Sequence, residues 1–556
     1  MRLLDRVLAG EDDEDRRIAE DDQPLAEPVA AASPLAWYWT VGLVVAVALP
    51  RLIYIFLVSN PENPGDGWYG DTFHHWQIAY LTKEVGLTAP DGPRLWDLKG
   101  LDYFWGLLQP LLLVVLFYAT GSIDIVLERL LSVAFGVLVV VLIFHLCRRH
   151  WGMRVAVPAT AFATLVPTAV FNDGQGILEP IGVGLTLLGI WLWPKRGLWT
   201  GVSWALAAMA RAEAWIFAIG MIVASFLRRE GARQRVLLVS SWGLLMLVYM
   251  KSLLDHTGNA IYPLSENFLN NALGRWEFET VLTPDQIAVR PVLGVMLALA
   301  VLGLAWTLWK RPNGYMFLTF GFGYWVFTAG TLGFTAYLKS WVWWFWYIRF
   351  FDFPYEFAGV VTAIVLFYLL PRWVGERKGL VVAVVVGALT LVAVQAAWTP
   401  ILSVYRPTES VWSQTMSAGR LIGGVYQQPQ NRRGVLNLPP TKPDLTYVLA
   451  RFDGVDGKHI VGQLYDPFYY LPSGYSYAGH SLVAGLLMQC WLSDTRTRLF
   501  MVDENASPNY VAFIADHQDW FTEAGRIPEY SWVLYQVDVP KPSAGNCAAA
   551  NRAARA

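Results

Sequence analysis

The segment after the first apolar stretch of the chain holds two carboxylates and two histidines in Gly-rich surroundings. Asp66 and Asp71 are five residues apart, and Asp71 stands where an amphipathic helix is predicted to begin. A carboxylate in this place can act as a general base on an attacking hydroxyl. It can equally be a helix N-cap, and spacing alone leaves both interpretations open. His74 and His75 are adjacent and point to different faces of a helix, which favours interfacial side chains over a shared metal site.

Two further acids lie between two apolar segments. Asp173 belongs to an Asn-Asp-Gly sequence that is also typical of a turn, whereas Glu179 lies deeper in apolar sequence. An ionisable side chain at the edge of a membrane span is costly unless it faces a polar cavity. Both acids are therefore candidates for a functional role.

Three cations interrupt apolar sequence in a similar way. Arg211 breaks a hydrophobic hairpin, two residues before Glu213, with which it could form a simple ion pair. Lys339 and Arg349 enclose a Trp-rich loop of the kind found at membrane interfaces. A guanidinium at that boundary can hold a phosphate in bidentate fashion, or it can extend to water.

Together these residues suit the transfer of a group from a lipid-linked phosphate donor. A carboxylate would take the proton of the acceptor, and cations would stabilise the phosphate as it leaves. Such chemistry requires that segments far apart in the chain meet on one side of a membrane.

The composition points to a membrane protein. Of the 556 residues, 55% are hydrophobic and 15% charged, against about 25% charged in soluble domains, and the mean hydropathy is +0.37. A chain this apolar would expose large patches in water, which excludes a soluble cytosolic enzyme. The net charge of −2 does not favour nucleic acid as a partner. Three cysteines allow one bridge and no cysteine zinc site.

We predict a polytopic α-helical protein with about eleven membrane-spanning helices. Residues 1–36 form an acidic tail that is expected to be disordered, and residues 37–400 form the membrane domain, with a long first outer loop at 59–128. Several of the apolar segments are shorter than the roughly 20 residues of a perpendicular crossing. They are 37–58, 130–147, 153–171, 177–193, 197–210, 214–227, 236–253, 291–309, 314–334, 353–370 and 380–398.

The distribution of basic residues predicts the orientation. One set of loops holds 14 Lys and Arg in 33 residues, and the opposite set holds 8 in 133, if the segment 107–120 does not cross. The positive-inside rule makes the first set cytoplasmic. The N-terminus is then cytoplasmic and the acids and cations described above lie on the outer side of the cell membrane. The cytoplasmic loops are 148–154, 194–198, 228–235, 310–313 and 371–379.

Residues 401–556 are predicted to form a soluble extracytoplasmic domain of the α/β or α+β class. Strands are expected at four places and a helix at 481–492. Cys490 and Cys547 both fall in this domain, so a bridge between them is open in an oxidising compartment. Asp466 and nearby aromatic residues could bind a glycan by stacking, although a role in the domain core is favoured. The expected strands are 446–452, 498–503, 510–515 and 532–539.

In its layout the chain resembles the GT-C superfamily of integral-membrane glycosyltransferases, and in particular the protein mannosyltransferase and aminoarabinose transferase type. The sequence Gly70-Asp71-Thr72-Phe-His-His-Trp-Gln-Ile-Ala79 is similar to the Asp-Glu type motif of their first outer loop, with Thr72 where a second acid is often found. Three more segments resemble the end of that loop, a basic break between short helices and a late outer loop that clamps the lipid phosphate. They are 109–131, 210–214 and 349–354.

The resemblance implies an inverting hexosyl- or pentosyltransferase that uses a polyprenyl-phosphate sugar. Asp71 or Asp66 would be the base, Arg349 and Arg211 would hold the phosphate with support from Lys339, and the acceptor would be a glycan, lipid or protein. Four residues are left to position the acceptor or the sugar, namely Asp173, Glu179, His74 and His75. A divalent cation, Mg²⁺ or Mn²⁺, is compatible with the acids. A transporter or lipid flippase, which often carries internal repeats, and a non-catalytic membrane scaffold are the alternatives.

Overall fold

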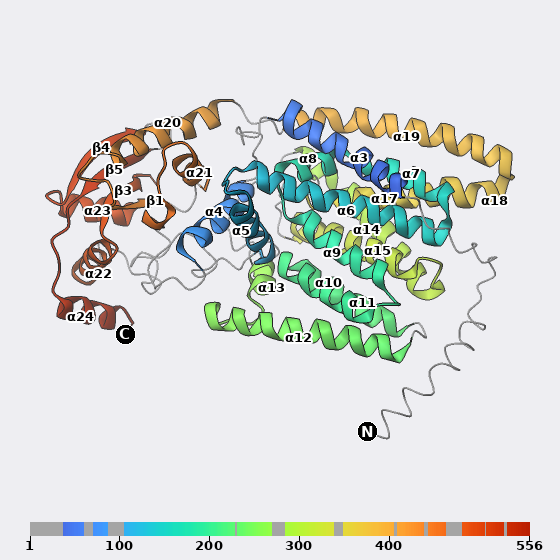
Figure 1. Cartoon of the computed structure of the whole chain (residues 1–556), viewed down its shortest axis with the longest axis horizontal. Coiled ribbons are helices and arrows are strands. Elements are labelled where there is room, and N and C mark those ends of the chain that lie inside the picture. Colours follow the sequence, from blue (N-terminus) through green and yellow to red (C-terminus); the bar gives the residue numbers. More distant parts are fainter. Residues whose placement is uncertain are drawn as a thin grey trace, which may run out of the picture. The chain divides into compact units, whose positions relative to one another are not determined.

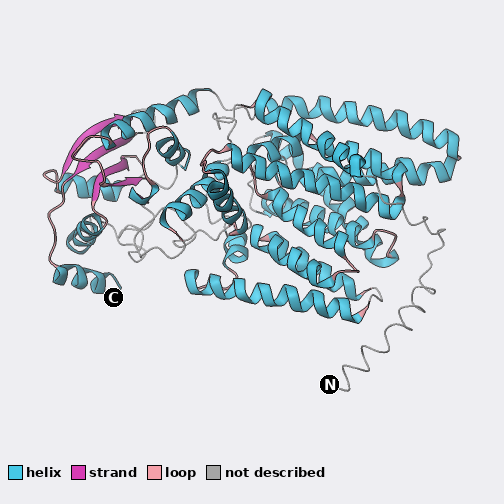
Figure 2. Cartoon of the chain, viewed as in Figure 1, coloured by secondary structure: helices cyan, strands magenta, loops and turns pink. Residues whose placement is uncertain are grey.

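The computed structural model describes residues 37–59, 70–86, 105–227, 231–269, 284–338, 349–404, 409–438, 443–462, 477, 481–505, 507–527 and 531–555. The chain divides into two compact units. Unit 1 comprises Met1–Pro61, Tyr103–Gln109 and Arg129–Tyr405. Unit 2 comprises Glu62–Asp102, Pro110–Glu128 and Arg406–Ala556. The described part of unit 1 is helical, whereas the strands lie in unit 2 (Figure 2).

Unit 1 is an assembly of long and short apolar helices, several of which run side by side (Figure 1). The helix α6, which has most of its length in this unit, is the most buried of the long apolar helices. The rest of the described unit consists of the helices that precede and follow α6 in the chain. In chain order the helices are α3 (Trp37–Ile53) with its π-helical continuation η1 (Tyr54–Val58), α6 (Val126–Trp151), α7 (Met153–Thr164), α8 (Pro167–Gln175), α9 (Glu179–Leu192), α10 (Gly197–Ala210), α11 (Glu213–Phe226), α12 (Ala232–Thr257), α13 (Tyr262–Asn267), α14 (Pro284–Lys310), α15 (Tyr315–Leu338), α17 (Asp352–Ile364), η4 (Val365–Leu369), α18 (Leu370–Val374) and α19 (Glu376–Val404).

Each of the eleven predicted spans coincides with a helix or a bent helix pair. Seven helices of the described residues are long and apolar enough to cross a membrane, and the pair α7 and α8, bent by 58°, makes up to eight. The helices α9, α10 and α11 have 14 residues each, or about 21 Å at 1.5 Å per residue. That is shorter than the roughly 30 Å hydrocarbon core, so eleven crossings stay a prediction.

Small residues let the helices α9, α10 and α12 approach one another closely. A Cβ atom on Gly201 of α10 would lie 2.0 Å from Oγ of Ser241 in α12, and one on Gly189 of α9 would lie 2.3 Å from Nε1 of Trp204 in α10. Close backbone approach at small residues is the usual way in which helices associate in lipid. Accordingly α10 lies between α9 and α12 (Figure 1).

Unit 2 contains a five-stranded sheet with the order β2-β1-β3-β5-β4. Strand β1 pairs in parallel with β2 and β3, while β5 pairs antiparallel with β3 and β4. The mixture of parallel strands and helices agrees with the predicted α/β or α+β class. The strands are β1 (Val435–Leu438), β2 (Ile460–Gly462), β3 (Thr497–Asp503), β4 (Phe521–Ile527) and β5 (Trp532–Val537).

Two of the four expected strands are confirmed and two are wrong. Segments 498–503 and 532–539 form β3 and β5, and the predicted helix 481–492 is α22 (Ser481–Asp494). Segments 446–452 and 510–515 instead lie in α21 (Pro443–Arg451) and α23 (Pro508–Asp516). Each of these helices has Pro among its first residues, which favours a helix start, and α23 buries Tyr510, Phe513 and Ile514 at helical spacing.

The helix α4 (Gly70–Val85), which carries Asp71, packs within unit 2 against α21. The ring of its Trp76 packs edge to face on the ring of Tyr447 of α21, with the ring centroids 4.9 Å apart. Nε2 of Gln77 donates a hydrogen bond to Oγ1 of Thr446 at 2.8 Å. The hydroxyl of Tyr80 donates to the carbonyl of Val455 at 3.1 Å. Burial raises the pKa of Tyr80, so this hydroxyl keeps its proton. The remaining helices with residues in this unit are α5 (Leu108–Thr120), α20 (Glu409–Tyr426) and α24 (Ala544–Arg555).

The disulfide that the sequence left open is present. Cys490 of α22 is bonded to Cys547 of α24, with Cα atoms 5.8 Å apart. The third cysteine, Cys147, is free and buried in unit 1. The bridge ties the C-terminal helix to the core of unit 2.

Candidate functional site

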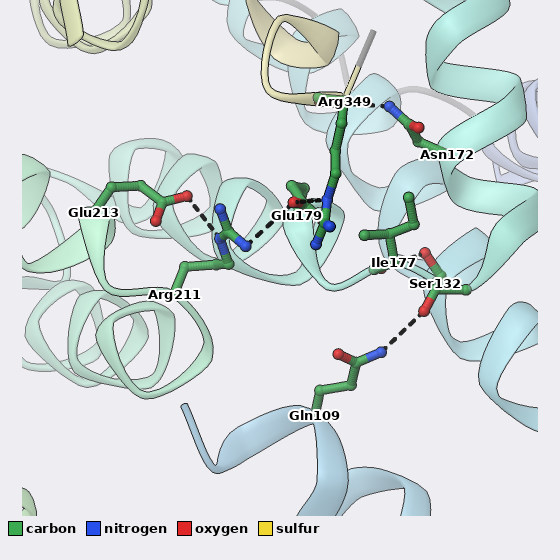
Figure 3. Close-up of polar contacts among 9 residues, drawn as sticks. Gln109, Ser132, Asn172, Ile177, Glu179, Arg211, Glu213 and Arg349 are labelled. Carbon is green, nitrogen blue, oxygen red and sulfur yellow. Dashed lines mark hydrogen bonds and ion pairs between the residues drawn. The ribbon is translucent and has the colours of Figure 1, made fainter. Parts of the chain in front are cut away.

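A tight turn between α8 and α9 presents Glu179. Helix α8 ends at Gln175 and is capped by Gly176, whose φ of 87° lies in the left-handed region that favours glycine. Side chains from other helices hold this turn (Figure 3). Nε2 of Gln109 donates to the carbonyl of Gly176 at 3.1 Å, and Oγ of Ser132 donates to the carbonyl of Ile177 at 2.7 Å. Glu179 is thereby placed by hydrogen bonds that do not involve its own carboxylate.

The two arginines predicted to bind phosphate both contact this carboxylate. Oε1 of Glu179 lies 2.6 Å from Nε of Arg349 and 3.2 Å from Nη1 of Arg211 (Figure 3). All three side chains are buried, with exposed fractions below one tenth. Residues 170 positions apart are thus joined by a charge-assisted contact in a setting where electrostatic interactions are strong.

Arg211 also makes the ion pair that the sequence suggested. Its Nε lies 2.7 Å from Oε1 of Glu213. The two residues can face each other because Arg211, which follows the end of α10, has an extended backbone and α11 begins at Glu213. The ion pair is therefore confirmed, and the break between two short helices exposes the same guanidinium to a second carboxylate, that of Glu179. Phosphate binding by Arg211 stays a prediction.

The ring of Phe350 packs against both arginines. Its centroid lies 5.5 Å from Cζ of Arg211 and 5.3 Å from Cζ of Arg349. A cation over an aromatic face is attracted by the ring quadrupole. The ring therefore helps to hold two like charges near each other.

A second buried charge cluster contains residues that the sequence did not single out. Arg51 of α3 is fully buried, with Nε 2.5 Å from Oδ2 of Asp173 and Nη2 3.8 Å from Oε1 of Glu356. Asp352 interacts electrostatically with the same group. Charges inside apolar spans are functional candidates by default, so Arg51 and Glu356 could have been found from their place in segments 37–58 and 353–370.

The two clusters are adjacent. Nδ2 of Asn172 donates to the carbonyl of Arg349 at 3.4 Å, next to Asp173 in the chain. One pocket is lined by acids of both clusters together with Arg349, and a second by Arg211, Glu213 and aromatic rings. Glu179 and Tyr324 line both pockets. The site of unit 1 therefore brings guanidinium groups and carboxylates together in two adjacent clusters. The acids of the first pocket are Asp173, Glu179, Asp352 and Glu356.

The other predicted site residues fall elsewhere. Asp71 lies in the first turn of α4 and is partly exposed. His74 and His75 are buried in unit 2, with ring centroids 6.0 Å apart. Asp66 and Lys339 lie outside the described residues, as does Asp466.

The metal prediction finds no support in the described residues. Within these ranges no group of three or more His, Cys, Asp and Glu side chains is arranged to hold a metal ion. The densest group of acids surrounds Arg51, whose guanidinium already supplies a positive charge to Asp173 and Glu356. We therefore derive no step through a divalent cation.

No protein-family model and no curated protein sequence matches the chain. Solved structures do. The apo oligosaccharyltransferase of Archaeoglobus fulgidus matches with a TM-score of 0.50 and 12% identity, over 86% of this chain and 71% of that one. The same enzyme tethered to an acceptor peptide with an NVT sequon matches with a TM-score of 0.50 and 12% identity, over 91% and 75%.

ArnT from Cupriavidus metallidurans, bound to undecaprenyl phosphate, matches with a TM-score of 0.50 and 14% identity, over 92% of this chain and 100% of that one. The chain therefore shares the fold of these enzymes, and this fold agrees with the resemblance to the GT-C superfamily. At such identity the likeness concerns the fold, so the roles of residues rest on the geometry above.

Proposed function

We propose that the protein is an inverting glycosyltransferase that moves a sugar from a polyprenyl-phosphate donor to an acceptor hydroxyl. The observation that carries the proposal is the meeting of Arg211 and Arg349 at Glu179, in a buried site on a GT-C fold. The neighbour ArnT, bound to undecaprenyl phosphate, supports a lipid phosphate as the ligand of this fold.

Arg349 and Arg211 would bind the donor phosphate. A guanidinium presents several N–H donors in a plane and matches phosphate oxygens in bidentate fashion. Burial excludes water from the contact and strengthens it. Lys339 would add to the positive charge. Asp173 and Glu179, which line the same pocket as Arg349, would position hydroxyl groups of the sugar or the acceptor.

In the reaction, Asp71 or Asp66 would take the proton of the acceptor hydroxyl. The acceptor oxygen would form a bond to the anomeric carbon while the bond from that carbon to the phosphate oxygen breaks. The electron pair stays on the phosphate, and the arginines would stabilise its added charge. His74 and His75 lie on the same helix as Asp71 and would help to position the acceptor or the sugar.

We further propose that transfer takes place on the extracytoplasmic side. The basic loops support a cytoplasmic N-terminus, and the disulfide between Cys490 and Cys547 supports an oxidising compartment for the C-terminal domain.

The test uses the full chain in lipid nanodiscs and a panel of polyprenyl-phosphate sugars, with binding and slow donor hydrolysis as readouts. Arg349→Ala should weaken binding of the accepted donor by about a hundredfold, since a charge-assisted bidentate contact contributes roughly 3 kcal/mol. Arg372→Ala is the matched control, because Arg372 is exposed and donates to the carbonyl of Tyr368. Equal binding in both variants, or no donor bound by the wild type, would favour a transporter or flippase.

Asp71→Asn should leave donor binding within about twofold and abolish transfer, as expected for loss of a base worth 10²–10⁴-fold or more. Transfer at the wild-type rate in this variant would move the assignment to Asp66. The Asp66→Asn variant measured beside it decides between the two.

A further inference from the structure

The side chains that form ion pairs around Arg211 and Arg349 carry two negative and two positive charges. Two guanidinium groups, of Arg211 and Arg349, contact the carboxylates of Glu179 and Glu213. Glu179 contacts both guanidinium groups through one oxygen and is 3% exposed. A carboxylate in that place competes with any other anion for the same N–H groups.

The proposed reaction changes the charge of the lipid phosphate. The donor is a phosphodiester with a charge of −1. When the bond between the anomeric carbon and the phosphate oxygen breaks, the electron pair stays on the phosphate, and the product is a monoester with a charge of about −1.5 to −2 at pH 7. Two guanidinium groups without a nearby carboxylate would bind this product more tightly than the donor, and turnover would then be limited by product release.

We propose that Glu179 is a specificity-determining residue that makes the site prefer the singly charged phosphodiester donor over the more highly charged phosphomonoester product. This inference rests on the proposed function. Glu179 offsets part of the positive charge, so that the second negative charge of the product is not matched and the lipid phosphate is released.

The position of Glu179 suits this role better than that of Glu213. Glu179 is held at a turn that Gln109 and Ser132 fix, so it cannot easily withdraw from the arginines. It also lines both pockets and is 3% exposed, whereas Glu213 lines one, pairs with Arg211 and is 11% exposed. Glu213→Gln is therefore a matched control with the same change in charge.

The experiment measures equilibrium binding of two probes to the full chain in nanodiscs at pH 8. The probes are undecaprenyl phosphate, a monoester, and its methyl phosphodiester, which carries one charge fewer. We expect Glu179→Gln to raise the affinity for the monoester relative to the diester by about tenfold or more, as loss of one nearby charge in a buried site implies. Glu213→Gln should change this ratio less.

If both probes bind but the ratio of their affinities is the same in Glu179→Gln as in the wild type, the inference is overturned. The proposed function would then still stand. If the wild type binds neither probe, the proposed function itself fails. The wild type alone gives a second test that needs no variant. It should bind the diester at least as tightly as the monoester, and a tenfold preference for the monoester would contradict the role of Glu179.

Discussion

Two arginine–carboxylate pairs, one in each unit, have nearly the same contact distance and very different surroundings. Arg51 and Asp173 are 2.5 Å apart in unit 1, with side chains 0% and 2% exposed. Arg526 and Glu504 are 2.6 Å apart in unit 2, with side chains 45% and 34% exposed. Distance is therefore a poor guide to what a pair does.

Desolvation separates the two cases. A charge in the interior has no water to replace a lost partner, so removal of one member leaves an uncompensated buried charge. At the surface, water and salt take over the interaction. The buried pairs of unit 1 therefore determine how the site is held, and the exposed pairs of unit 2 can change with little effect.

The largest expected effect is that of Arg51→Ala. It leaves Asp173 and Glu356 buried without their cation, and should cost about 3–5 kcal/mol of stability. Thermal unfolding in detergent, followed by tryptophan fluorescence, measures it. The triple variant Arg51→Met, Asp173→Leu and Glu356→Gln removes the buried charges together and should recover much of the loss. A triple variant no better than the single one would show that the three side chains do not act as a unit.

Next in size is the loss of the disulfide bridge in unit 2. Replacing Cys490 and Cys547 by Ala opens a link across 57 residues and should cost about 2–4 kcal/mol. Unfolding and proteolysis of the C-terminal helix report the change. Dithiothreitol should destabilise the wild type and leave the variant unaffected, and an equal response of both would contradict the expectation.

A smaller effect is expected from Gly136→Ala in α6. The new Cβ would lie 1.9 Å from Oδ2 of Asp173, so the carboxylate must shift away from Arg51, at a cost of roughly 1–3 kcal/mol. Gly220→Ala is the matched control, since a Cβ there meets nothing within 4 Å. Similar melting temperatures for the two variants would mean that the Arg51 cluster adjusts freely.

The smallest effect belongs to the exposed pair. Arg526→Ala removes contacts to Glu504 and Glu523 and should leave the melting temperature unchanged within error, because exposed pairs contribute little. A loss as large as that of Arg51→Ala would erase the distinction between the units.

The sequence predicts the helices of unit 1 well because a helix that crosses a bilayer needs a long apolar run, and such runs are visible in the sequence. It also singles out Glu179, Arg211 and Arg349, since each interrupts apolar sequence near a break. Arg51 and Glu356 escape because they lie inside segments that we interpret as uninterrupted spans. Their acidic and basic partners come from other helices, and no local pattern encodes that pairing.

The packing of α4 within unit 2 is the main feature that the sequence does not predict. The contact of Gln77 with Thr446 joins residues 369 positions apart, and neither segment has a local signal for the other. The misassigned segments in α21 and α23 have a similar cause, because short apolar runs fit both strand and helix until their burial is known.

The contact between α4 and α21 has a consequence for biosynthesis. At about 5–20 residues per second, the ribosome needs roughly 20–70 s to add the 369 residues that separate Gln77 from Thr446. During this interval the apolar face of α4, with Trp76 at its centre, lacks its partner. The helix α4 can therefore complete its packing only after α21 has been made, near the end of synthesis.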